Sequence, residues 1–167
     1  PDVPNGKVVD TPVQLLDVFP SILDAADVQP NITEKDLKGH SLFDLANDAK
    51  PDRIIISEQH SAGAKSASFM VRKDQYKLIY HVGYPNQLFD LEKDPEERVD
   101  LSSDPAFASV SADLEAQLRK ILDPEEIDKK AKADQAARIK EGGGQDAIVA
   151  KGSPGYTPAP GETPVFV

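Results

Sequence analysis

An apolar stripe is predicted near the start of the chain, made of Leu15, Val18, Phe19, Ile22, Leu23 and Ala26. Spacings of three and four place these side chains on one face of a helix. Thr11 and Pro12 predict its start, because a hydroxyl caps unpaired N–H groups and proline needs none in the first turn. Pro20 interrupts the pattern and predicts a kink or two short helices. No nearby segment offers this stripe a partner, so we expect it to pack against a body of protein outside this chain.

The pattern then changes to short, β-branched and alternating runs, which predict four strands at residues 53–58, 66–72, 76–82 and 87–91. Lys73-Asp74-Gln75 is a link of hairpin length, so the two runs beside it are expected to pair antiparallel. Residues 28–52 are polar and interrupted by proline and glycine. They predict an irregular connection that contains a short apolar turn at residues 41–45.

A second helical stripe follows Asp104-Pro105 and consists of Phe107, Val110, Leu114, Leu118, Ile121 and Leu122. This helix is the natural cover for the sheet. A further helix, from Pro124 to Lys140, is rich in alanine and charge, and so is expected to lie on a surface, to bridge subunits or to fray. Gly142-Gly143-Gly144 ends it, and residues 145–167, with four prolines, are predicted to form an extended tail.

These elements predict an α+β fold, in which a small antiparallel sheet of about four strands is covered by a C-terminal helix. The 29 acidic and 19 basic residues give a net charge of −10. A surface of that sign repels nucleic-acid phosphates and anionic lipids, and no apolar run approaches the ~18 residues of a membrane helix. We therefore expect no nucleic-acid and no membrane partner. The absence of cysteine excludes disulfides and thiolate sites within the chain and leaves the compartment, cytoplasmic or periplasmic, open.

Four motifs follow one another along the chain, namely TPVQLLDVFPSIL (residues 11–23), GHSL (39–42), MVRKDQYKLI (70–79) and QLFDLEKDPEE (87–97). The ordered series resembles the sulfatase family. The matching features there are the helix after the last active-site loop, a Gly-x-Ser-Leu turn, an Arg-x-x-x-Tyr-Lys hairpin and a Leu-Tyr/Phe-Asp-Leu-x-x-Asp-Pro-x-Glu signature. The resemblance extends to about Leu122, and the segment after it looks more loosely like the choline-sulfatase-like branch. The last motif is interpreted as structural.

The resemblance implies a large α/β domain of the alkaline-phosphatase type followed by a smaller domain. Residues 1–30 would then be the last helical segment of the α/β catalytic domain. Residues 31–123 would be the C-terminal subdomain, and residues 124–167 the polar helix with its Pro/Gly-rich tail. The implied partner is the N-terminal catalytic part of the same protein.

The implied reaction is hydrolysis of a small sulfate ester by a formylglycine nucleophile and a divalent cation, usually calcium. The Cys/Ser-x-Pro-x-Arg motif that carries the nucleophile is absent, since Ser102-Ser103-Asp104-Pro105-Ala106 has the wrong spacing and no arginine. The Asp-rich metal loops are absent too, so no catalytic and no metal-binding residue is expected in this chain. Two alternatives are a phosphonate or phosphate ester hydrolase of the same superfamily and a non-catalytic oligomerisation module.

Four residues are candidate substrate contacts at the rim of the implied active site: His60, Gln59, His81 and Tyr84. A histidine there offers a hydrogen bond or a positive charge to an anionic group. The alternatives are a strand-end histidine on the surface for His60, and ordinary sheet packing for His81 and Tyr84. The apolar tip of the tail, with Tyr156, either docks on a neighbouring subunit or is disordered. Docking would give a homo-oligomer through the C-terminal helix and tail.

Overall fold

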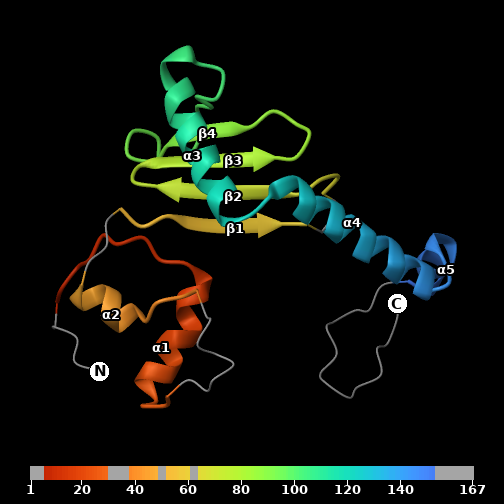
Figure 1. Cartoon of the computed structure of the whole chain (residues 1–167), viewed down its shortest axis with the longest axis horizontal. Coiled ribbons are helices and arrows are strands. Elements are labelled where there is room, and N and C mark those ends of the chain that lie inside the picture. Colours follow the sequence, from red (N-terminus) through yellow and green to blue (C-terminus); the bar gives the residue numbers. More distant parts are fainter. Residues whose placement is uncertain (1–5, 30–37, 49–51, 61–63, 153–167) are drawn as a thin grey trace. The chain divides into compact units, whose positions relative to one another are not determined.

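The computed structural model describes residues 6–29, 38–48, 52–60 and 64–152. The chain divides into two compact units, Pro1–Pro124 and Glu125–Val167. Each unit is described by itself (Figure 1).

The first unit begins with two short helices in succession, η1 (Leu15–Asp17) and α1 (Val18–Ala25). Of the predicted kink or two short helices, two short helices are found, but they meet between Asp17 and Val18 and not at Pro20; Pro20 lies in the first turn of α1, where no N–H is needed. The predicted start at Thr11 is wrong. Gln14 is the extended N-cap residue, and the Pro12 carbonyl oxygen accepts a hydrogen bond from Arg53 instead of opening a helix.

Residues 42–47 form helix α2 (Leu42–Asn47), where the sequence predicted only an irregular connection with an apolar turn. The Ser41 side chain caps this helix by accepting a hydrogen bond from the Phe43 N–H. The sequence did not predict α2 because its start signal, the Ser41 cap followed by Leu42 and Phe43, is short and lies within a polar segment.

The predicted sheet is confirmed as four antiparallel strands in the order β1-β2-β3-β4. They are β1 (Ile55–Gln59), β2 (Ser68–Lys73), β3 (Tyr76–His81) and β4 (Gln87–Asp90). Asp74 adopts a left-handed backbone, with φ +53°, in the tight turn between β2 and β3. Each strand therefore pairs with its neighbour in the sequence.

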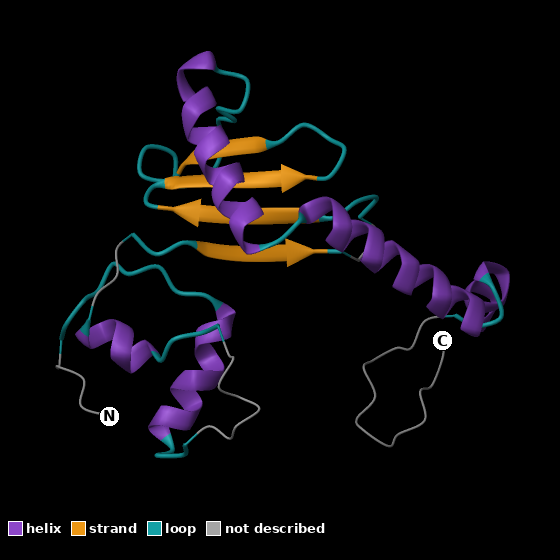
Figure 2. Cartoon of the chain, viewed as in Figure 1, coloured by secondary structure: helices purple, strands orange, loops and turns teal. Residues whose placement is uncertain are grey.

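One face of the sheet is covered by helix α3 (Ala108–Ile121), which follows the short helix η3 (Pro105–Phe107) (Figure 2). Asp104 caps η3 by accepting a hydrogen bond from the Ala106 N–H. The core between helix and sheet consists of Phe69, Val71, Leu78, Leu88, Leu114 and Leu118, all almost fully buried. Burial of these side chains supplies the main stabilisation of the first unit.

The second unit contains α4 (Pro124–Glu141), close to the predicted limits, and α5 (Gln145–Lys151). The prediction of an extended tail is therefore wrong for residues 145–151, while residues 153–167 lie outside the described part. Gly143 and Gly144 have φ of +91° and +96°, which ends α4 and reverses the chain. The Ile148 side chain then packs against Gly142, where a Cβ would come within 2.9 Å. In the described part of the chain, no helix is long and apolar enough to cross a membrane.

Candidate functional site

The strand register brings two of the four predicted rim residues into one row. Gln59 pairs with Ser68, and Ser68 pairs with His81. Residues paired across antiparallel strands have side chains on the same face, so Gln59 and His81 share a face with backbones roughly 10 Å apart. This face lies opposite α3, because the neighbouring row of Phe69 and Tyr80 faces the helix, where Arg119 stacks over the Tyr80 ring at 5.2 Å.

His60 lies on the other face. Its Nε2 is 2.8 Å from the Glu58 carboxylate, and its ring meets Phe69 edge-on with a centroid separation of 5.5 Å. The second ring nitrogen, Nδ1, is buried. One nitrogen therefore contacts Glu58 at the surface and the other is buried, and the structure does not bring His60 together with Gln59 and His81.

His81 is the last residue of β3, and Tyr84 lies in the turn between β3 and β4. The Asn86 side chain accepts a hydrogen bond from the His81 N–H at 3.2 Å, and Gln87 Oε1 lies 3.3 Å from His81 Nε2. Tyr84 is 55% exposed. His81, Tyr84, Asn86 and Glu115 line a shallow surface depression with donors, acceptors and an aromatic ring. This end of the sheet can offer hydrogen bonds to a polar ligand.

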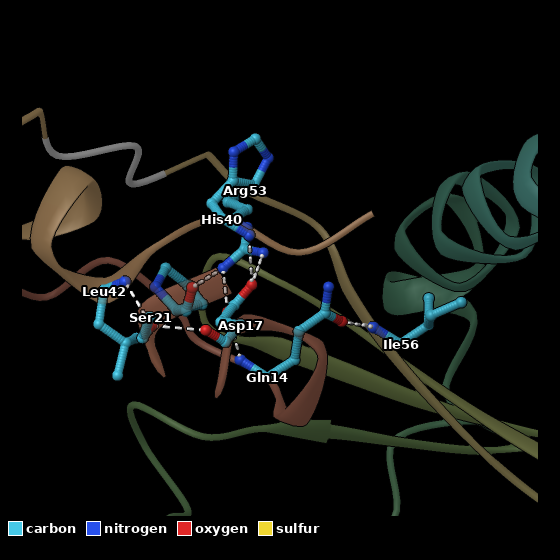
Figure 3. Close-up of polar contacts among 8 residues, drawn as sticks. Gln14, Asp17, Ser21, His40, Leu42, Arg53 and Ile56 are labelled. Atoms are coloured by element: carbon cyan, nitrogen blue, oxygen red, sulfur yellow. Dashed lines mark hydrogen bonds and ion pairs between the residues drawn. The ribbon is translucent and has the colours of Figure 1, made fainter. Parts of the chain in front are cut away.

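A buried carboxylate that the sequence analysis missed organises the N-terminal part of the first unit (Figure 3). Asp17 is fully buried and accepts hydrogen bonds from Arg53 at 2.6 and 2.7 Å, and from the backbone N–H groups of Gln14 and His40 at 2.8 and 3.0 Å. Burial alone would raise the pKa of Asp17, but the Arg53 hydrogen bond and the two N–H groups outweigh it and lower the pKa to about 2.

Two serines extend this polar network along α1. Ser21 Oγ donates to the Asp17 carbonyl oxygen at 2.5 Å and accepts from the Leu42 N–H at 2.8 Å. Ser41 Oγ donates to Asp24 at 2.6 Å. The spacing of Asp17, Ser21 and Asp24 by four and three residues was a readable signal, because it marks one face of a helix.

The Gly-His-Ser-Leu turn has a steric requirement. A Cβ at Gly39 would lie 1.9 Å from the Leu16 carbonyl oxygen, so only glycine lets residues 38–41 approach the end of η1. Glycine thus brings the His40 N–H to Asp17 and Ser41 to Asp24.

The helix pair η1–α1 consequently has its polar side turned inward and its apolar side turned outward. Asp17 and Ser21 are buried, whereas Leu15 is 89% and Ile22 is 59% exposed. Further large side chains exposed on this segment are Leu16, Val18 and Phe19. A contiguous apolar surface of this kind marks an interaction site.

The Arg-x-x-x-Tyr-Lys and Asp-Pro-x-Glu motifs meet in an ion pair. Lys77 Nζ lies 2.7 Å from the Glu97 carboxylate, which joins β3 to the turn after β4. Asp100 accepts hydrogen bonds from the N–H groups of Leu88 and Ser102, which lower its pKa against the effect of burial. These acids hold the chain in place, in keeping with the structural interpretation of the motif. Within the described ranges no cluster of three or more His, Asp or Glu side chains is arranged to hold a metal ion.

Comparisons with known proteins agree with this architecture. The family described as "N-sulphoglucosamine sulphohydrolase, C-terminal" matches residues 1–124. Arylsulfatase K of Danio rerio is 34% identical over 138 residues, which cover 77% of this chain and 25% of that protein. An arylsulfatase of Clostridium perfringens is 36% identical over 99 residues, covering 58% of this chain and 20% of that protein.

Two solved structures are similar at 26% identity. A putative sulfatase from Bacteroides thetaiotaomicron has a TM-score of 0.53 and covers 72% of this chain and 25% of its own. A 2-O GAG sulfatase has a TM-score of 0.52 and covers 72% of this chain and 26% of its own.

The sheet covered by one helix, with the preceding helical segment, is the C-terminal part of a sulfatase. The chain belongs to the N-sulphoglucosamine sulphohydrolase C-terminal family. It spans about a quarter of the length of the arylsulfatase K relatives. Its assignment to the choline-sulfatase-like branch stays a prediction.

Proposed function

We propose that this chain acts as the C-terminal part of a sulfuric ester hydrolase whose nucleophile and metal lie in an N-terminal catalytic part. The observation that carries the proposal is the family match over residues 1–124, together with arylsulfatase relatives about four times as long as the matched region. The outward apolar side of η1–α1 supports it, because that side needs a protein surface to cover it.

Formylglycine would supply the nucleophile, and calcium would withdraw charge from the ester oxygens. The described residues of this chain hold no carboxylate or imidazole cluster suited to the cation, so its ligands would come from the catalytic part. This chain would instead shape the rim of the active site. Gln59 and His81 would donate hydrogen bonds to the substrate from their shared row, and the exposed Tyr84 ring would border it.

His60 would have a positioning role and not a direct contact with the substrate. Glu58 holds its Nε2, and Phe69 holds its ring, so His60 would order the end of β1 and thereby position Gln59 beside it. A direct contact of His60 with the substrate would require the imidazole to leave Glu58.

The test is hydrolysis by the whole protein purified from its source organism. The expected result is a higher kcat/KM for 4-nitrophenyl sulfate than for the phosphate and phosphonate analogues, loss of activity on chelation of calcium, and an aldehyde-bearing residue detected by mass spectrometry. A preference for the phosphonate would favour the related ester hydrolase. A stable native protein of only these 167 residues without activity would favour the oligomerisation module.

Gln59→Ala and His81→Ala test the rim. Each is expected to raise KM for the sulfate ester with kcat less affected, because a lost ground-state contact weakens binding. Gln117 on α3 forms hydrogen bonds with Asp113 and Lys120. Gln117→Ala is the matched control and should leave both kcat and KM unchanged.

A further inference from the structure

The sheet has a second face that none of the helices described in the first unit crosses. Helix α3 covers one side, and the strand register assigns the other side by alternation (Figures 1 and 2). The side chains of this open face include Ser57, Met70, Arg72, Lys77, Ile79 and Gln87; the same register places Ile55 and Phe89 there, on the two edge strands, and these two are buried. Met70 and Ile79 pair at its centre and are only half-buried, while Ser57 next to them is exposed.

Arg72 is the unusual member of this face. Its direct neighbours across the strands are Ile55 and Lys77, so a second positive charge stands beside it. Like charges directly opposite each other destabilise a sheet. Glu97 neutralises Lys77 at 2.7 Å, whereas the hydrogen bond of Arg72 within the described ranges is a long one, 3.5 Å from its Nε to the Asp74 carbonyl oxygen. Among the described residues, no carboxylate forms an ion pair with Arg72.

From this arrangement we infer that the open face is a contact surface for the catalytic part of the same protein, and that an acidic side chain of that part pairs with Arg72. The inference rests on the proposed function for the existence of that part. The apolar centre at Met70 and Ile79, with polar side chains around it, has the composition of a protein interface. A guanidinium with fixed fork geometry fits a carboxylate in such a place.

The catalytic part is the occupant that the molecule favours over a second copy of the chain. The relatives have about three quarters of their length outside the matched region, and the matching family is a C-terminal one. In a symmetric contact through this face, a second copy would bring its own Arg72, which would add positive charge to the contact instead of neutralising it.

Thiol labelling of the whole protein tests directly whether the open face is covered. Ser57→Cys places a thiol on the open face at a position exposed in this chain, and Ala112→Cys places one on the exposed side of α3. Labelling by a maleimide, read at each site by peptide mass spectrometry, is expected to be roughly tenfold slower at position 57. Equal rates at the two positions would overturn the inference. Hydrolysis of the sulfate ester by the unsubstituted protein tests the proposed function separately.

Charge reversal tests the role of Arg72. In the whole protein, Arg72→Glu is expected to lower the unfolding midpoint and to speed labelling at position 57, whereas Arg72→Lys, which keeps the charge, does so much less. Arg98→Glu is the control, because Arg98 is exposed and pairs only with Glu96 at the surface. If Arg72→Glu raised KM for the sulfate ester and left labelling unchanged, Arg72 would be a ligand contact and the interface would be refuted.

Discussion

Asp17 and Arg53 lie 36 residues apart and form a two-pronged ion pair in which the carboxylate is fully buried. The pair ties η1 to the segment that enters β1. Removing one partner leaves a buried charge without its counter-charge. Arg53→Met should therefore lower the free energy of unfolding by about 3–5 kcal/mol, measured by urea denaturation.

The control for this change is Arg98→Met. Arg98 and Glu96 form an exposed pair, and such pairs contribute at most about 1 kcal/mol. Equal losses from the two substitutions would contradict a special role for the buried pair.

The lowered pKa of Asp17 predicts an acid-sensitive stability. The folded-state pKa of about 2 lies below the ordinary 3.8, so Asp17 contributes stability above pH 4 that is lost as the pH falls from 4 to 2. The contribution is about 2 kcal/mol, from the size of the shift. Urea denaturation between pH 2 and 6 measures it, and Asp17→Asn should flatten this part of the curve. An unchanged pH profile in that variant would refute the assignment.

Gly39→Ala should destabilise the first unit by about 3 kcal/mol, because its Cβ meets the backbone of Leu16, which has no flexible end to move away. Gly83→Ala is a matched control. Gly83 has φ +75° and open space around it, so alanine there costs only the backbone strain of about 1 kcal/mol. The thermal unfolding midpoint of Gly39→Ala should lie below that of Gly83→Ala. The reverse ranking would exclude the close approach of Gly39 to the Leu16 backbone.

The outward apolar side of η1–α1 predicts the behaviour of the chain expressed alone. It should aggregate or bind a hydrophobic dye, and Leu15→Ser combined with Ile22→Ser should reduce the dye fluorescence. Val99→Ser removes one exposed apolar side chain elsewhere and should have little effect. A soluble chain that does not bind the dye would argue against a missing protein surface over η1–α1.

The strands and α3 were predictable from the sequence because their apolar residues follow periods of two and about 3.6. The alternating apolar positions, among them Phe69, Val71 and Leu78, predict the face that α3 covers. The same reasoning found the stripe of α1 and expected it to lack a partner within the chain.

The Asp17 network was missed because its members come from three separate segments. Neither Arg53 nor the His40 N–H lies near Asp17 in the sequence, and a carboxylate within an apolar run looks like a solvent-facing position. The helix start was misplaced at Thr11 for a related reason. The local cap signal was outweighed by the Arg53 contact to the Pro12 carbonyl oxygen, which only the folded chain reveals.

The two-residue turn at Asp74 has a consequence for how the domain reaches its native state. Since every strand pairs with the next one in the sequence, the sheet can grow outward from this turn by closing short loops only, which favours rapid folding. The ion pair between Asp17 and Arg53 can form only after Arg53 is held in place beside β1. We expect the sheet to form early and the N-terminal helices to join it late.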